Sequence, residues 1–386
     1  TVLDFIGSQH RQFRFANRLR ALSSEPTVRL DREVEQGFPH LPPGCAIRME
    51  RVAQQRVLEN IRQSLHLRRP QMVRELAEWA RHQGRPPTLR EAIDYLHTNL
   101  DELLKRGLWS RLLADAGLVP EPTDADEDLL ARGIRRLAHI DDPRQIRFQL
   151  NVLRDEQPAE EEDAELVERR LTMLFVTLFG KTSEGWSTDK ALARLRQNTA
   201  ACHDLVAVLE HRLHVTPMRL EPIEPAVSGP LAIHGTYTRD EILAGLGQST
   251  MQRRPEFREG VLHLPDSKVD AFFVTLHKTE EAYSPTTMYE DYAISDRLFH
   301  WQSQSTTSVD SPTGKRYINH KQVGYTPLLF VREHKYLPGG LASPYRYLGP
   351  AEHVRHEGDR PISIVWRLKY PIPVRLQRDT NRQVPA

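Results

Sequence analysis

A dense group of aromatic and polar side chains lies between residues 270 and 304, around and after the apolar run FFVTL (272–276). Aromatic rings beside short polar side chains can hold a planar group between their faces and read its edge, which is how proteins hold a flipped nucleobase. The alternative is that these rings fill the core of a β-rich domain, because aromatic residues pack more often than they bind. Residue types alone leave both interpretations open.

The candidates for base binding fall into two groups. The stacking candidates share an aromatic ring and are Tyr283, Tyr289, Tyr292, Phe299 and Trp301. The candidates for contacts with the base edge share a hydrogen-bonding group and are Asp291, His300, Gln302 and Gln304. A carboxylate or amide can meet the N4 amino group and the pyrimidine edge of a cytosine. The sequence does not separate inward-facing from outward-facing rings.

Basic side chains follow, interleaved with tyrosines. The candidates for contacts with DNA phosphates are Lys278, Lys315, Arg316, Arg332, Lys335 and Arg346. This interleaving is typical of phosphate contacts beside stacking platforms, although a solvated surface explains it almost as well. Because the net charge is only +1, nucleic-acid binding would depend on local patches rather than on a global field.

Length and cysteine content limit the class of protein. A chain of 386 residues exceeds the size of a single core, so we expect two or three domains. Cys45 and Cys202 are far apart and lack zinc-ligand spacing, which suits a reducing cytoplasm. The longest apolar run, 171–179, is about half of the roughly 20 residues that span a membrane. Because the chain begins on the strand-like VLDFI, we expect a fragment whose partner strands lie upstream.

The catalytic motifs that we searched for are missing or incomplete. Gly180-Lys181-Thr182 resembles the end of a phosphate-binding loop, but Phe175 occupies the position of its first glycine. Neither HExxH nor GxSxG occurs. The histidine pair at 353 and 356 lacks the carboxylates or cysteines of a metal site. The sequence therefore predicts no catalytic residue, no metal site and no cofactor in this chain.

Helical and strand-like patterns occupy different parts of the chain. Residues 67–222 have leucines at helical spacing, and the proline-rich segment 221–230 reads as a linker. Thr238 and Glu241 form a capping box that predicts a short helix over 239–246. The predicted strands are 261–264, 272–276, 298–302, 328–333, 345–349 and 362–368.

Several segments together resemble one protein family. VLDFIGSQHRQFRF (2–15), GFPHLPPGC (37–45) and RVAQQRVLENIR (51–62) resemble the end of the second RecA-like domain of bacterial superfamily 2 helicases. The segments that resemble the C-terminal domain of unknown function of the same proteins are YTRDEILAGLG (237–247), FFVTLHKTE (272–280), DYAISDRLFHWQSQ (291–304), LLFVRE (328–333) and YLGPAEHVRHEGDRPISIVWRL (347–368). The chain thus resembles the C-terminal part of a phospholipase-D-nuclease and helicase protein of the SauUSI-like type IV restriction group.

The resemblance implies that different domains of a parent protein carry out catalysis and DNA recognition. Its nuclease and its helicase, which uses ATP and Mg²⁺, would lie upstream and would be partners of this chain. The C-terminal domain would read 5-methylcytosine or 5-hydroxymethylcytosine in double-stranded DNA. It would do so by base flipping into an aromatic pocket, in a barrel-like domain of the PUA or SRA type. The chain itself would not be an enzyme.

We therefore expect an α+β multidomain chain in three parts. These are a remnant of the helicase domain (1–66), a helical middle domain (67–222) and a β-rich, barrel-like reader of modified bases (230–386). The rival hypothesis is a structural module that couples helicase to nuclease, or holds a homodimer together, without reading a base. A third is that the basic residues grip DNA nonspecifically while specificity lies upstream.

Overall fold

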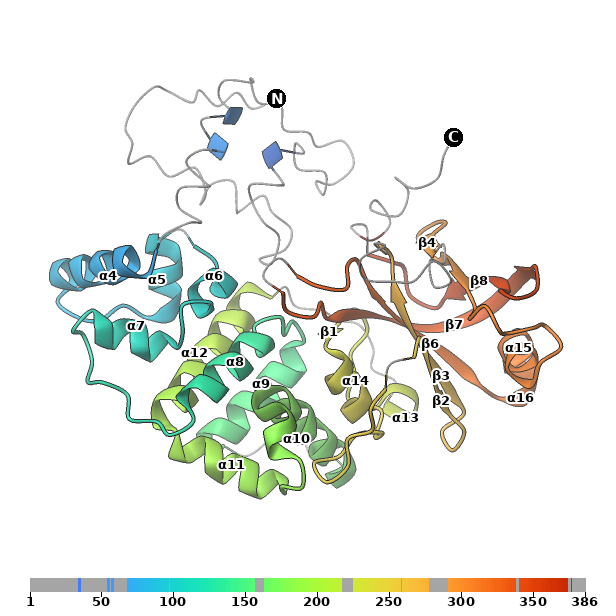
Figure 1. Cartoon of the computed structure of the whole chain (residues 1–386), viewed down its shortest axis with the longest axis horizontal. Coiled ribbons are helices and arrows are strands. Elements are labelled where there is room, and N and C mark those ends of the chain that lie inside the picture. Colours follow the sequence, from blue (N-terminus) through green and yellow to red (C-terminus); the bar gives the residue numbers. More distant parts are fainter. Residues whose placement is uncertain are drawn as a thin grey trace. The chain divides into compact units, whose positions relative to one another are not determined.

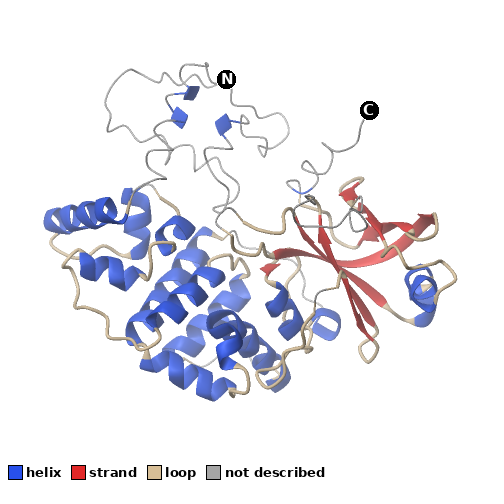
Figure 2. Cartoon of the chain, viewed as in Figure 1, coloured by secondary structure: helices blue, strands red, loops and turns tan. Residues whose placement is uncertain are grey.

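The computed structural model describes residues 34–35, 54–55, 57–58, 68–96, 98–156, 163–216, 225–257, 259–277, 291–337, 340–373 and 376. Most of the predicted helicase remnant (1–66) lies outside these residues. The described chain divides into two compact units: residues up to 138 with 192–215 form the first, and residues 139–191 with those from 216 onward form the second. A helical part comes first along the described chain and a part with a mixed sheet follows, which confirms the predicted α+β class. Figure 2 distinguishes the helices from the strands by colour.

The first unit is built from amphipathic helices. Its helices, which are labelled in Figure 1, are α4 (Arg69–Gln83), α5 (Leu89–Leu96), α6 (Leu100–Leu104), α7 (Trp109–Asp115), α8 (Glu127–Leu137) and α12 (Thr199–Val215). In α5, Leu89, Ala92, Ile93 and Leu96 are buried, a spacing that places them on one face. α12 packs against α5, α7 and α8. Helix α11 (Thr188–Gln197) crosses the boundary between the two units in sequence.

The second unit combines helices with one mixed sheet. Its helices are α9 (Pro143–Arg154), α10 (Ala164–Phe179), the 3₁₀ turn η1 (Gly180–Ser183), α13 (Pro225–Ser228), α14 (Arg239–Gly245), α15 (Pro312–Ile318) and α16 (His320–Val323). Its strands are β1 (Thr236–Tyr237), β2 (Val261–Leu264), β3 (Val269–Thr275), β4 (Tyr292–Ala293), β5 (Leu298–Gln302), β6 (Thr326–Arg332), β7 (Tyr345–Glu357) and β8 (Ser363–Leu368).

The strand order is β2-β3-β6-β7-β8-β5-β4, with β1 paired to β7. β3 and β6 run parallel, and the other pairs are antiparallel. The sheet is open rather than closed, which corrects the expected barrel-like form. The physical reason is that the four-residue β2 and the two-residue β4 end the path without pairing with each other, whereas a barrel has no free edges.

Two apolar clusters cover the two faces of β3 and β6. Alternate residues Phe272, Val274, Leu329 and Val331 point into the cluster that also contains β5 and β8, here called the β5–β8 core. Their neighbours in sequence point into a cluster with α14 and Met173 of α10, here called the α14 core. Every residue of β3 is buried, as expected of a strand covered on both faces.

Buried polar contacts hold the start of the C-terminal domain to the segment that precedes α9. The Asp141 carboxylate accepts hydrogen bonds from the backbone N–H and hydroxyl of Thr236, at 2.7 and 2.8 Å. The Tyr237 hydroxyl donates to Asp142 Oδ2 at 2.8 Å. Burial raises the pKa of Asp142 above its ordinary value, against the lowering effect of that hydrogen bond. These contacts tie α9 to the compact unit that contains the sheet, and α10 belongs to that unit because it packs against α14.

Within the described part of the chain, none of the helices has the length and apolar character needed to cross a membrane.

Candidate functional site

The hairpin of β4 and β5 positions most of the predicted base-binding residues that the structure describes. β5 pairs antiparallel with β4 on one side and with β8 on the other. Because successive side chains of a strand point to opposite faces, Phe299 and Trp301 lie on one face, and His300 and Gln302 lie on the other. Their burial alternates in step, with Phe299 and Trp301 buried and the others half-buried. The strand therefore separates the predicted residues into two groups.

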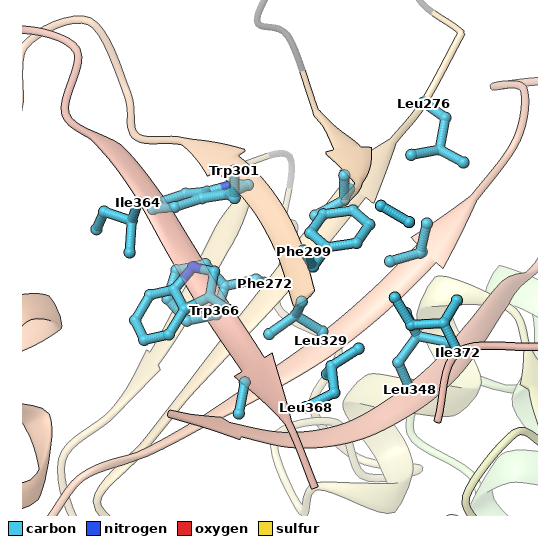
Figure 3. Close-up of a cluster of buried hydrophobic side chains, with 14 of the residues drawn as sticks. Phe272, Leu276, Phe299, Trp301, Leu329, Leu348, Ile364, Trp366, Leu368 and Ile372 are labelled. Atoms are coloured by element: carbon cyan, nitrogen blue, oxygen red, sulfur yellow. The ribbon is translucent and has the colours of Figure 1, made fainter. Parts of the chain in front are cut away.

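Phe299 and Trp301 belong to the β5–β8 core, where they are 1% and 6% exposed (Figure 3). The Trp301 ring packs edge-on against Phe272 and Tyr317, with centroids 4.6 and 5.6 Å apart. Trp366 of β8 joins the same group, 5.4 Å from Phe272. The faces of these rings are covered by other side chains, so a base could reach them only if the core opened.

The other face of the hairpin carries a stacked pair of rings. The rings of Tyr292 and His300 are opposite each other in the β4–β5 register and stack with centroids 4.7 Å apart and planes 18° from parallel. Both side chains are half-buried. A planar base could extend this stack, because offset stacking needs only one accessible ring face.

Hydrogen-bonding groups surround the stack. Asp291, which is 4% exposed, accepts a hydrogen bond from the Gln302 backbone N–H at 3.0 Å. The Gln302 amide donates to Ser363 Oγ of β8 at 3.3 Å. Gln304 lies apart from this group, because its amide oxygen accepts from Thr307 Oγ1 at 3.2 Å and its side chain also bonds to the buried Tyr317. The structure thus gathers Asp291, Tyr292, His300 and Gln302.

Two further side chains share this outward face but were not singled out from the sequence. Ser363 and Arg367 of β8 lie opposite Gln302 and Leu298 in the β5–β8 register. The signal was present in ISIVWRL, where Ile364, Trp366 and Leu368 are core residues and the alternate positions point away from it. Tyr292, His300, Gln302, Ser363 and Arg367 are called the reading face below.

The positive charge that Arg367 gives the reading face lies beside a negative charge on β7. Arg367 is exposed and lies opposite Glu352 in the β7–β8 register. The ammonium group of Lys321 binds the Glu352 carboxylate at 2.8 Å, and this hydrogen bond lowers the pKa of Glu352. The Glu352 carboxylate therefore binds Lys321 and also experiences the positive charge of Arg367.

The predicted phosphate contacts do not gather on one surface. Lys315 and Arg316 lie on α15, Arg332 and Lys335 lie at the end of β6, and Arg346 lies on β7. Arg316 Nε binds the buried Asp270 carboxylate at 2.8 Å. Arg346 donates to the His234 carbonyl oxygen at 2.7 Å.

The remaining three basic side chains have weaker or neutral partners. Lys315 is exposed and lies 3.7 Å from Asp310. Arg332 Nε donates to Thr275 Oγ1 at 2.9 Å. The Lys335 ammonium lies 5.5 Å from the centroid of the Tyr336 ring. Lys315 and Arg332 are therefore better placed than Arg316 and Arg346 to meet an external anion.

Tyr283, Tyr289 and Lys278 lie outside the described residues. Among the described residues no group of three or more His, Cys, Asp or Glu side chains could hold a metal ion.

Comparison with known families identifies the C-terminal part of the chain. Residues 231–379 match the family described as Domain of unknown function (DUF3427), the C-terminal domain of helicase-associated proteins. The match covers the sheet, α14 to α16 and the whole reading face. A search of the curated proteins found no match.

Proposed function

We propose that residues 231–379 form the part of a modification-dependent restriction enzyme that selects DNA carrying 5-methylcytosine or 5-hydroxymethylcytosine. The observation that carries the proposal is the half-buried Tyr292–His300 stack beside hydrogen-bonding side chains. A flipped cytosine would stack on these rings. The Gln302 amide oxygen would accept a hydrogen bond from its N4 amino group, and the buried Asp291 would hold the Gln302 backbone in place.

The reading face carries one apolar side chain beside the stack. Val365 lies opposite His300 in the β5–β8 register and is 6% exposed, so the C5-methyl group of a pyrimidine would make an apolar contact with it only if the His300 ring shifted. We expect only a modified cytosine to be retained in this position, so the stacking and edge contacts would also contribute to the preference.

The resemblance to SauUSI-like proteins supports the rest of the proposal. The nuclease and the ATP- and Mg²⁺-dependent helicase would lie upstream in the parent protein, and this chain would bind double-stranded DNA without catalysing a reaction. The parent protein would act in the cytoplasm. A phosphate contact from Lys315 would accompany the base contacts.

A second candidate function is self-association or coupling between domains. Two exposed aliphatic side chains favour it, because Val323 of α16 and Val354 of β7 are 45% and 38% exposed and these two elements pack together. A patch of two residues is small for a stable interface. Sedimentation of the chain would detect a dimer.

The experiment compares three duplexes of identical sequence that carry cytosine, 5-methylcytosine or 5-hydroxymethylcytosine at one position. Fluorescence anisotropy gives a Kd for each. We expect the chain to prefer a modified duplex, and Tyr292→Ala and His300→Ala to remove most of the preference. Matched controls are Tyr336→Ala and His356→Ala, since both side chains are exposed and lie off the reading face. Equal affinity of the unaltered chain for all three duplexes would refute the proposal.

A further inference from the structure

Two arginines share one buried tyrosine ring at the end of the parallel strands. Arg332 follows the last buried residue of β6, and its guanidinium carbon lies 4.4 Å from the Tyr345 ring centroid. Arg239 begins α14, and its guanidinium carbon lies 5.8 Å from the same centroid. The Tyr345 side chain, 1% exposed, belongs to the α14 core. Two guanidinium groups thereby contact one ring.

Neutral partners fix both guanidinium groups. Arg332 donates from Nε to Thr275 Oγ1 at 2.9 Å and from Nη1 to the Ser343 carbonyl oxygen at 3.3 Å. Arg239 donates from Nη1 to the Phe257 carbonyl oxygen at 3.1 Å and from Nη2 to the Tyr345 hydroxyl at 3.0 Å. Each guanidinium has five N–H donors, so each retains donors for a ligand in an already fixed orientation.

Within the described residues, the hydrogen-bond partners of both guanidinium groups are uncharged. Both groups contact one buried ring, and two like charges repel each other more strongly where water is partly excluded. A bound anion would offset this repulsion.

Two histidines lie just beyond the C-terminal ends of the parallel strands β3 and β6. His277 follows β3 and His334 follows β6, and their rings stack with centroids 4.7 Å apart. The His277 backbone N–H continues the ladder between β3 and β6 by donating to the Glu333 carbonyl oxygen at 2.8 Å. Because side chains alternate along a strand, His277 lies on the face of Thr275, and His334 on that of Arg332. Arg239, His277, Arg332 and His334 are called the basic edge below.

We propose that the basic edge is a phosphate-binding site, separate from the reading face. A phosphate group has the charge and the oxygen geometry that the donor fork of arginine binds best. The basic edge lies on the α14 side of the sheet, whereas the reading face lies beyond the β5–β8 core on β4, β5 and β8. Ligands commonly bind at the carboxyl ends of parallel strands, which is where Thr275 and Arg332 lie in register. The site does not depend on whether the reading face accepts a base.

The ligand phosphate could belong to a nucleic-acid backbone or to a small molecule, and the experiment has one arm for each source. The first arm measures the melting temperature of the full chain in sodium phosphate and in sodium chloride of equal ionic strength. The second measures affinity for an unmodified duplex across a series of salt concentrations. Both arms use the unaltered chain, Arg239→Gln/Arg332→Gln, and the control Arg90→Gln, which removes one exposed charge on α5 of the first unit.

We expect phosphate to raise the melting temperature of the unaltered chain and of Arg90→Gln, but not that of the double variant. If the source is nucleic acid, the double variant also binds the duplex about tenfold more weakly, and its salt slope falls by about one for each DNA phosphate that the arginines no longer neutralise. If only the phosphate response disappears, the site binds a small phosphate-bearing ligand.

Absence of a phosphate effect on the unaltered chain, or the same effect in the double variant, overturns the proposal. Because the arginines also pack on Tyr345, the double variant could lose its fold. Arg332→Lys and His334→Gln provide the second comparison, since the lysine keeps the charge without the fork and His334 is exposed. An unchanged phosphate response in both folded single variants would also contradict the proposed site.

Discussion

The two sides of β5 carry different kinds of residue and have different surroundings. On one side, Phe299 and Trp301 are surrounded by Phe272, Tyr317 and Trp366 in the core. On the other, His300 stacks on Tyr292, and Gln302 reaches Ser363. Alternate positions of this segment therefore stabilise the domain, and we propose that the positions between them present side chains to a ligand.

The largest effect should come from removing a large side chain on the core side of β5, and it should be an effect on stability. Trp301→Ala should lower the free energy of unfolding by about 3 to 5 kcal/mol, because it removes a buried ring and leaves a cavity. Urea unfolding followed by circular dichroism measures this. If the variant keeps its stability and loses only DNA binding, the assignment of Trp301 to the core is wrong.

The outward side should respond in the opposite way. Tyr292→Ala should cost about 1 to 3 kcal/mol of binding to methylated duplex, the usual contribution of one stacked base. Its stability should change by no more than about 0.5 kcal/mol, since the side chain is half-buried and lies outside the core. Anisotropy and urea unfolding on the same sample test both parts. A large loss of stability would place Tyr292 with the core residues.

Two nearby glutamines provide a matched pair. Gln302→Ala removes the amide bonded to Ser363 on the reading face and should reduce methyl discrimination about fivefold, the effect of roughly 1 kcal/mol. Gln304→Ala removes the partners of Thr307 and Tyr317 and should lower stability by about 1 kcal/mol with discrimination unchanged. Identical behaviour of the two variants would remove the distinction between the sides of the strand.

The smallest effect should be a pH dependence of stability that comes from a histidine on the core side. His320 packs on Trp366, accepts a hydrogen bond from the His353 backbone N–H at 3.0 Å and contacts the Tyr325 carbonyl oxygen through Nδ1 at 2.9 Å. Burial lowers the pKa of His320, and the positive charge of Lys321 acts in the same direction, while Tyr325, Glu352 and Asp270 oppose it. The folded state therefore binds this proton less readily than the unfolded chain.

Stability from His320 should accordingly be complete above the ordinary histidine pKa of about 6.5 and should decrease as the pH falls through the lowered pKa. Urea unfolding at a series of pH values, for the unaltered chain and for His320→Gln, isolates this contribution. If acidification through this range raised the free energy of unfolding of the unaltered chain but not that of the variant, the predicted direction of the pH dependence would be wrong.

The local parts of the fold were predictable from the sequence. The segments VLHL and LFHWQ coincide with β2 and β5, and the capping box of Thr238 and Glu241 is present at the start of α14 with both hydrogen bonds formed. These features depend on alternation and on contacts three residues apart. The parallel pairing of β3 with β6, and the open ends of the sheet at β2 and β4, depend on contacts between distant segments and were not predictable.

The candidate site was predictable as a set of residues but not as an arrangement. Alternation along LFHWQ shows that Phe299 and Trp301 share one face, but which face is inward depends on β8 and Phe272. For the same reason Ser363 and Arg367 were missed, because they reach the reading face only through pairing of β8 with β5. Arg316 and Arg346 looked like free cations in the sequence, whereas their contacts with Asp270 and His234 come from other strands and loops.

Photo-cross-linking would show whether the reading face contacts the modified base. A duplex carrying 5-iodocytosine in place of the 5-methylcytosine would be irradiated with the chain, and the attached peptide would be identified by mass spectrometry. We expect attachment within residues 291–302 or 363–367, suppressed by excess methylated duplex and not by unmethylated duplex. Attachment elsewhere, for example at the basic edge, or equal suppression by both competitors, would show that the reading face does not hold the modified base.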